Sequence, residues 1–154
     1  MLPFPRNKKG FTLIELLVVI AILSVLLVIV LVAINPAQQT RAARNTQRRA
    51  DVLTILNAVN QYFVANGSFP AGTPTATGSA NAKDISSAGT GFSFCDALVP
   101  NYVAALPFDP KIGSYTDCNT YNTGYKITLN TGDRITISAP EGLNDGNVTI
   151  QATR

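Results

Sequence analysis

Residues 8–34 read KKGFTLIELLVVIAILSVLLVIVLVAI, and this stretch decides the architecture of the chain. From Phe11 onward its only polar side chains are Thr12, Glu15 and Ser24. At a rise of about 1.5 Å per residue, the part after Glu15 forms a helix of roughly 28 Å, close to the hydrocarbon thickness of a bilayer. Because lipid offers the backbone no hydrogen-bond partners, we expect a helix here in spite of the many β-branched residues.

Two other interpretations of this apolar run fit less well. A cleaved secretory signal has an apolar core of about 7–15 residues followed by a small-x-small cleavage site. Residues 16–34 are longer than that, and no such site follows Ile34. A buried helix of a soluble domain rarely runs so far without a polar face. We therefore predict a membrane-spanning helix that stays on the protein.

A single carboxylate, Glu15, lies inside the apolar run. A charged group at the bilayer centre costs about 2.5–3.5 kcal/mol on insertion scales, and such residues generally mark a function with a definite partner. The sequence therefore predicts that Glu15 meets a cation.

Residues 6–34 resemble the leader and N-terminal segment of type IV prepilins and of type II secretion pseudopilins. The leader is basic and carries Arg6, Lys8 and Lys9. Gly10 then precedes Phe11, and Glu15 is the fifth residue counted from Phe11. The resemblance implies a membrane aspartyl peptidase that cuts between Gly10 and Phe11 and N-methylates Phe11. It also implies a helical filament in which the new amine at Phe11 of one subunit neutralises Glu15 of its neighbour, a strong pairing inside low-dielectric packing.

The same resemblance implies an α+β pilin fold, in which a long N-terminal helix packs on a small antiparallel sheet. Its expected segments are the leader 1–10, the transmembrane or filament-core helix 11–35, the amphipathic helix 36–66, the αβ-loop with an irregular segment 67–123, and the antiparallel sheet 124–154. The precursor is expected to cross the cytoplasmic (inner) membrane once, with its C-terminal domain outside the cytoplasm. After assembly it would belong to a cell-surface pilus or a periplasm-spanning pseudopilus.

The expected partners follow from that resemblance. They are further copies of the chain in a homopolymer or mixed filament, the prepilin peptidase, an assembly ATPase, an inner-membrane platform protein and membrane lipid. The chain shows no nucleotide-binding motif, so a separate ATPase would have to supply the energy of assembly. Removing the leader also removes three cations, so 12 − 3 = 9 Lys and Arg balance 9 Asp and Glu, and the basic net charge is no sign of nucleic-acid binding.

Residues 36–66 are predicted to form a second helix. Asn35-Pro36 precedes it, either as a kink or as a cap with Pro36 as the first helical residue. Its apolar face combines a 3–4–3 row with an adjoining row, at Val52, Ile55, Val59 and Tyr62 and at Leu53, Leu56 and Phe63. Such a face needs a sheet or other helices to cover it. Asn66-Gly67 indicates the end of the helix.

Four arginines lie between the membrane span and this apolar face, at Arg41, Arg44, Arg48 and Arg49. They could bind anionic lipid, DNA or a neighbouring subunit, or they could be solvated. We favour subunit contacts or solvation. DNA stays a minor alternative, because four arginines without interleaved aromatic residues make a thin footprint. These cations also oppose the basic leader, so the positive-inside rule does not by itself orient the chain.

The C-terminal half contains one expected loop and several expected strands. Residues 71–91 are rich in small and polar residues, with Ile85 as the exception, and are expected to form a long surface loop that buries little. Alternating apolar residues then predict an antiparallel sheet of three or four strands, at Tyr125, Ile127 and Leu129, at Ile135 and Ile137, and at Val148, Ile150 and Ala152.

The proline-rich segment 98–110 argues against regular structure and resembles the Leu-Pro-x-Asp-Pro loop that precedes the sheet of major pseudopilins, where a calcium ion can sit just downstream. The candidate calcium ligands are Asp109, Asp117 and Asn119. Scattered Asp residues of this kind are more often turn formers, and calcium needs six or more oxygens.

Cys95 and Cys118 are the only cysteines, and in an extracytoplasmic domain such a pair most often forms a disulfide. The sequence contains no His, which excludes a Cys–His nucleophile and a mixed Cys/His zinc site. No catalytic constellation stands out, so we expect neither an enzyme nor a resident cofactor other than the candidate calcium. The leading hypothesis is a pilus subunit. The alternatives are a pseudopilin of a type II secretion or DNA-uptake system and, in another class, a membrane-anchored binding domain that never assembles.

Overall fold

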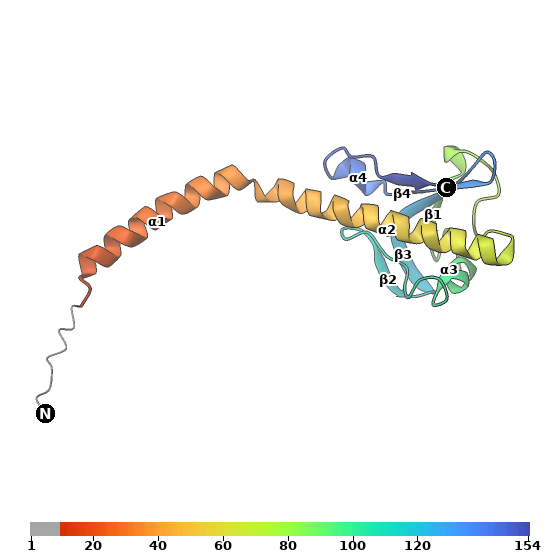
Figure 1. Cartoon of the computed structure of the whole chain (residues 1–154), viewed down its shortest axis with the longest axis horizontal. Coiled ribbons are helices and arrows are strands. Elements are labelled where there is room, and N and C mark those ends of the chain that lie inside the picture. Colours follow the sequence, from red (N-terminus) through yellow and green to blue (C-terminus); the bar gives the residue numbers. More distant parts are fainter. Residues whose placement is uncertain (1–9) are drawn as a thin grey trace, which may run out of the picture. The chain divides into compact units, whose positions relative to one another are not determined.

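The computed structural model describes residues 10–154, so the basic residues of the expected leader, Arg6, Lys8 and Lys9, lie outside the described part. The chain divides into two compact units, residues 1–39 and residues 40–154. The first described helix, α1, spans Leu13–Ile34 and contains no buried residue (Figure 1). Over the described residues, α1 is the one helix long and apolar enough to cross a membrane, judged by length and composition alone, with a mean hydropathy of 3.6.

Helix α2 spans Pro36–Asn66. Asn35 separates it from α1 with a left-handed backbone at φ 44° and ψ 75°, and so ends α1. The Asn35 side-chain oxygen accepts the Gln38 backbone N–H at 3.4 Å, and its backbone oxygen accepts the same N–H at 3.0 Å. Asn35 therefore caps a new helix with Pro36 as its first residue, as one of the two sequence alternatives predicted.

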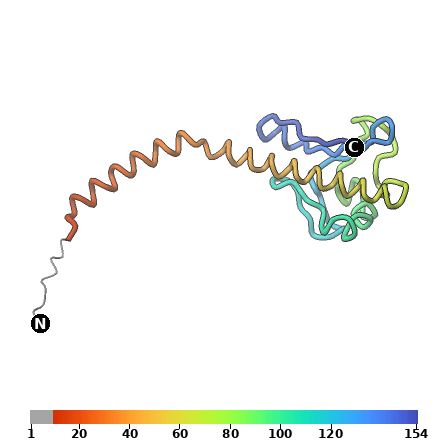
Figure 2. Tube along the Cα trace, viewed as in Figure 1, coloured from red at the N-terminus to blue at the C-terminus, as the bar shows by residue number. Residues whose placement is uncertain are grey.

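The second unit is an α+β fold, as expected from the sequence. A five-stranded antiparallel sheet contains β1 (Lys83–Ser86), β2 (Ser114–Asp117), β3 (Thr120–Asn130), β4 (Arg134–Ser138) and β5 (Gln151–Thr153). The main path runs β1-β3-β4-β5, and β2 pairs separately with the beginning of β3. Short helices α3 (Phe92–Leu98) and α4 (Glu141–Asn144) and the 3-10 turn η1 (Ser79–Asn81) complete the unit. Figure 2 traces the path of the chain through these elements.

The core lies where the apolar stripe of α2 meets one face of the sheet. Val52, Ile55 and Val59 of α2 are buried in the same cluster as Ile127 and Ile137 of the strands. Register explains the strand contribution, because Ile127 pairs with Ile137 in neighbouring strands and alternate residues point to the same face. The predicted stripe is too broad at its edge, since Leu53 is 51% exposed and Phe63 36% exposed.

The expectation of a long loop over residues 71–91 is wrong in part. Residues 83–86 form β1, which pairs antiparallel with β3, and the Ile85 side chain is fully buried. The segment 67–123, expected to be irregular after its loop, also contains α3 and β2, and β3 begins at Thr120, before the expected start of the sheet at residue 124. A short strand with a single large apolar residue leaves too little periodicity to be detected before its partner is known.

The proline-rich segment between α3 and β2 has no regular structure, as expected. Helix α2 ends at Asn66, and Gly67 follows with φ +71° while its N–H bonds the Phe63 oxygen at 2.8 Å. This is the glycine stop that the sequence predicts, because glycine enters the left-handed region without a Cβ clash.

Candidate functional site

The junction between the leader and the apolar helix is the first candidate site. Phe11 is 85% exposed, and Thr12 caps the N-terminus of α1. Both the backbone N–H and the hydroxyl of Thr12 donate to one carboxylate oxygen of Glu15, at 2.9 and 2.7 Å, and the Thr12 hydroxyl accepts the Glu15 N–H at 3.3 Å. This reciprocal capping box holds the Glu15 carboxylate near the start of the helix, where the helix dipole favours negative charge.

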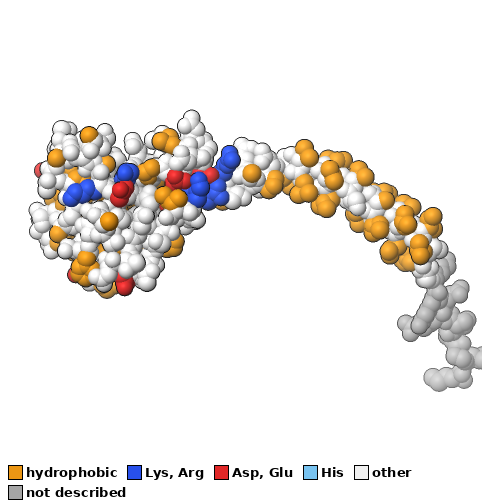
Figure 3. Space-filling view, turned by 180° about the vertical axis from the view of Figure 1, so that it is seen from behind, with side chains coloured by type: hydrophobic (Ala, Val, Ile, Leu, Met, Phe, Trp, Pro, Cys, Tyr) orange, Lys and Arg blue, Asp and Glu red, His pale blue; other side chains and the backbone are white. Residues whose placement is uncertain are grey.

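Apolar side chains run along the face of α1 that Figure 3 shows, and none of the residues of this helix is buried. Its large residues from Leu13 to Ile34 are roughly half exposed or more. The remaining polar side chain, Ser24, returns its hydroxyl to the Ile20 backbone oxygen at 2.7 Å and so offers little to a partner. An apolar surface of this extent has to be covered by lipid or by other helices.

A buried ion cluster in the second unit was not predicted. It consists of Arg44, Arg48, Asp109 and Asp145, and we call it the ion cluster. The Arg48 side chain is fully buried, and it donates to Asp109 through Nε at 2.6 Å and Nη2 at 3.1 Å. Its Nη1 donates to Asp145 at 2.9 Å. Arg44 makes a two-pronged contact with the same Asp145, with Nη2 at 2.6 Å from Oδ1.

The ion cluster joins α2 to two distant loops. Asp109 comes from the proline-rich segment, where its Oδ1 also accepts the backbone N–H groups of Lys111 and Ile112 at 2.8 and 3.3 Å. Asp145 follows α4, and its backbone oxygen accepts from the Asn45 side chain at 2.7 Å. Because the buried charges are paired and hydrogen-bonded, the cluster avoids the large cost of an isolated buried charge.

The arginines shift the acidity of both carboxylates. The hydrogen bonds from Arg44, reinforced by Arg48, hold the pKa of Asp145 well below its ordinary value. Burial acts to raise the pKa of Asp109, but the Arg48 guanidinium and the backbone N–H groups outweigh it and keep that pKa low. Nearby, burial raises the pKa of Asp51, whose carboxylate accepts the Tyr125 hydroxyl at 2.7 Å. Both cluster carboxylates are therefore ionised at neutral pH.

These contacts correct the interpretation of the four arginines. Arg44 and Arg48 are neither simply solvated nor unpaired, because they form ion pairs with Asp109 and Asp145 of their own chain. Arg41 lies at 3.9 Å from Asp145 with a side chain 57% exposed. A sequence signal existed: Arg48 lies four residues before Val52, at the head of the buried stripe of α2. Because Arg44 and Arg48 are paired within the chain, fewer cations remain exposed for contact with DNA.

The structure does not bring the three candidate calcium ligands together with oxygens free to bind a metal ion. Asp109 is engaged by Arg48, while Asp117 accepts the backbone N–H groups of Asn119 and Thr120 at 2.9 and 2.8 Å in its own turn. Among residues 10–154, no group of three or more His, Cys, Asp or Glu side chains could hold a metal ion. The geometry therefore gives the calcium hypothesis no support.

The disulfide between Cys95 and Cys118 is confirmed, with the two Cα atoms 5.3 Å apart. It joins α3 to the turn between β2 and β3.

Comparison with known proteins bears on the N-terminal junction. A family described as the prokaryotic N-terminal methylation motif matches residues 5–31. The chain carries this methylation motif. Its match ends within α1 and includes Gly10, Phe11 and Glu15.

The chain is also similar to two proteins named fimbrial protein, from Neisseria meningitidis serogroup B and from serogroup A. Each is 39% identical over 80 residues, which is 51% of this chain and 44% of the relative. The chain thus aligns with less than half the length of these relatives, and no solved structure matches it. The expected resemblance to type IV pilins is confirmed by the match of residues 5–31 and by the similarity to the two fimbrial proteins.

Proposed function

We propose that this protein is a structural subunit of a type IV pilus-like filament and assembles through α1 after its leader is removed. The observation that carries the proposal is an entirely exposed apolar helix that begins directly after the methylation junction. Such a helix can lie in the membrane before assembly and in a bundle of identical helices afterwards. Because both environments cover its apolar surface, the transfer from one to the other need not expose it to water.

In this proposal a peptidase cuts between Gly10 and Phe11, and Phe11 is N-methylated. Cleavage creates a positive amine on Phe11, one residue before the Thr12 N–H that already donates to the Glu15 carboxylate. Within one copy, Thr12 already supplies two hydrogen bonds to Glu15, but neither donor carries a charge. The amine of a neighbouring copy supplies the missing cation and sets the register of the incoming subunit.

The disulfide supports the proposed topology. Disulfides form and persist outside the reducing cytoplasm, so the unit that contains Cys95 and Cys118 belongs on the far side of the membrane. The leader then lies on the cytoplasmic side, where the peptidase, the assembly ATPase and the platform protein would act.

The proposal is tested by the intact mass and N-terminal sequence of the protein in a fraction sheared from the cell surface. We expect a chain that begins at N-methylated Phe11 in that fraction. Processed protein found in membranes alone would indicate a pseudopilin of a secretion or DNA-uptake system. A chain that keeps its leader and stays in membranes would refute the filament proposal and favour a membrane-anchored binding domain.

The role of Glu15 has its own test. We expect Glu15→Ala to reduce the sheared filament yield at least tenfold while cleavage still proceeds, because an incoming subunit loses its charged contact. Ser24→Ala is the matched control, since it removes the other polar side chain within α1. A Glu15→Ala chain that assembles as well as the Ser24→Ala chain would disprove the registering role.

A further inference from the structure

Two exposed cations outside the ion cluster, Arg49 and Arg154, border α2. Arg49 is exposed and forms no hydrogen bond or ion pair with any other described residue. Farther along α2, the Asn57 side-chain oxygen accepts a hydrogen bond from Nη1 of Arg154 at 3.3 Å. Arg49 therefore carries a positive charge that the described residues do not neutralise.

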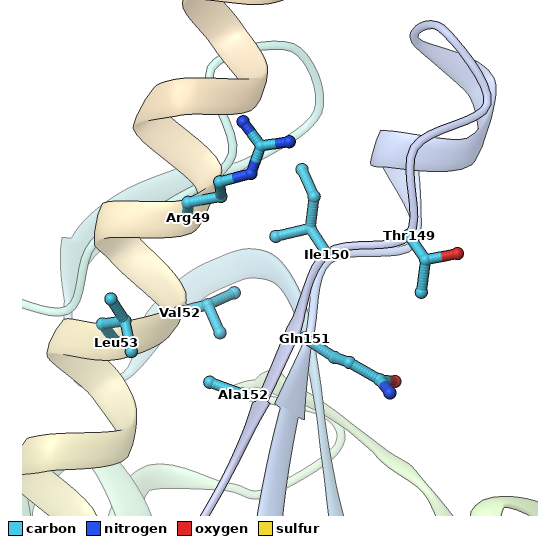
Figure 4. A pocket seen from close by; sticks show the side chains of 7 residues that line it. All are labelled: Arg49, Val52, Leu53, Thr149, Ile150, Gln151 and Ala152. Atoms are coloured by element: carbon cyan, nitrogen blue, oxygen red, sulfur yellow. The ribbon is translucent and has the colours of Figure 1, made fainter.

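Arg49 forms the rim of a groove between α2 and β5, which we call the α2–β5 groove (Figure 4). Val52, Ile150 and Ala152 point toward one another across it and form an apolar floor. The Arg49 guanidinium lies over Ile150. The groove has a volume of about 220 Å³, and Leu53, half exposed, extends its apolar surface along the helix.

A surface of opposite charge occurs elsewhere on the same unit. Asp96 of α3 and Asp117 of β2 are both exposed. They are 21 residues apart in the chain, but each adjoins one half of the Cys95–Cys118 disulfide, which brings their backbone segments close together. We call the exposed surface of α3 that contains Asp96 the α3 patch. Phe92, 47% exposed, lies four residues before Asp96 on α3 and adds an apolar side chain to that patch.

The two surfaces cannot meet within one copy. Figure 1 shows α3 and β2 on one side of α2, with β4 and α4 on the other, and the groove is on the side of β5, which pairs with β4. A contact between two different patches is heterologous, and repeated heterologous contacts build open helical assemblies rather than closed dimers.

We infer that the α2–β5 groove receives the α3 patch of a second copy of this chain, with Phe92 against the apolar floor and Asp96 against Arg49. This rests on the proposed filament function and deepens it by naming the surfaces that join neighbouring globular units. Complementary charges at the rim set the register of such a contact, while the buried aromatic side chain supplies most of its affinity.

The first test is a charge exchange in the full chain. Arg49→Glu and Asp96→Arg should each lower the sheared filament yield about tenfold or more, because each places like charges opposite one another. The double variant should restore the yield. Arg134→Glu is the control, since Arg134 is an exposed cation at the start of β4 that does not line the groove.

Each other outcome of the exchange overturns the pairing. Single variants that assemble like the control would show that the two surfaces do not meet. A double variant that stays defective would show that they do not meet each other. If Arg49→Glu alone is defective, the groove receives another anionic partner. Processed protein in the membrane, measured in parallel, shows that each variant folds and is cut.

A second test separates this inference from the proposed function. A photo-crosslinking amino acid in place of Leu53, in the otherwise intact chain, should join two copies in cells, with the adduct on the peptide that contains Phe92. Joined copies without any sheared filament would overturn the surface-pilus proposal and keep the interface. Sheared filaments without this adduct would overturn the interface and keep the filament.

Discussion

Replacing Arg48 by methionine should destabilise the second unit severely. Arg48→Met removes three hydrogen bonds to Asp109 and Asp145 and leaves Asp109 buried beside an apolar side chain. Removing one partner of a buried ion pair costs about 3–5 kcal/mol. Typical domains have a total unfolding free energy of about 5–15 kcal/mol. For a unit of this size, about 4 °C of melting temperature is lost per kcal/mol, so we expect a fall of roughly 12–20 °C.

Calorimetry of the detergent-solubilised chain measures this fall, and Arg41→Met is the matched control. Arg41 lies on the same helix and approaches the same Asp145, but at 3.9 Å and with a largely exposed side chain. Exposed pairs of this kind contribute about 0–1 kcal/mol. Adding Asp109→Asn to Arg48→Met should recover part of the loss, because no buried carboxylate then lacks its cation. If Arg48→Met melts within a few degrees of Arg41→Met, the assigned energetic role of the ion cluster is incorrect.

Further predictions concern acid, reduction and backbone geometry. The two carboxylates of the ion cluster have pKa values below their ordinary 3.8. Their contribution to the stability of the folded unit is therefore complete above pH 3.8 and is lost as the pH falls below it. A melting temperature that stays constant from about pH 4 to about pH 2 would contradict this. Reducing the Cys95–Cys118 disulfide, which closes a separation of 23 residues, should cost about 3 kcal/mol in denaturant titrations. Gly72→Ala should destabilise the second unit more than Gly67→Ala does. Both glycines have positive φ, but of the two only Gly72 lies where an added Cβ would meet backbone, 1.9 Å from the Thr90 oxygen. Equal losses in melting temperature would show that this clash is relieved.

Local patterns account for the elements that the sequence predicted correctly. The sequence spacing of apolar residues shows by itself which face of an element is buried. This applies to the apolar run of bilayer length, to the row of apolar residues at helical spacing and to the alternating strands. For the same reason α1, α2, β3 and β4 were found without knowledge of their partners, whereas the last strand, expected from Val148 onward, begins only at Gln151. The disulfide was predictable because the chain offers only one pair of cysteines.

Strand β1 shows where local patterns fail. Its burial alternates poorly, with Lys83 and Asp84 exposed and Ile85 and Ser86 both buried. An irregularity in its pairing with β3, between Asp84 and Ser86, breaks the period of two. Only the neighbouring strand, which supplies its hydrogen bonds, makes this segment a strand.

The sequence by itself determined the apolar helix with its solitary Glu15 and predicted the junction at Gly10 and Phe11, because these features depend on residues close together in the chain. The tertiary structure alone decided the fate of Arg48, which lies 61 residues from Asp109 and 97 residues from Asp145. Coulomb attraction depends on distance in space and on exclusion of water, and neither leaves a period in the sequence. On folding, the four arginines of α2 therefore divide into two that neutralise carboxylates of their own chain, Arg44 and Arg48, and two whose side chains stay exposed, Arg41 and Arg49.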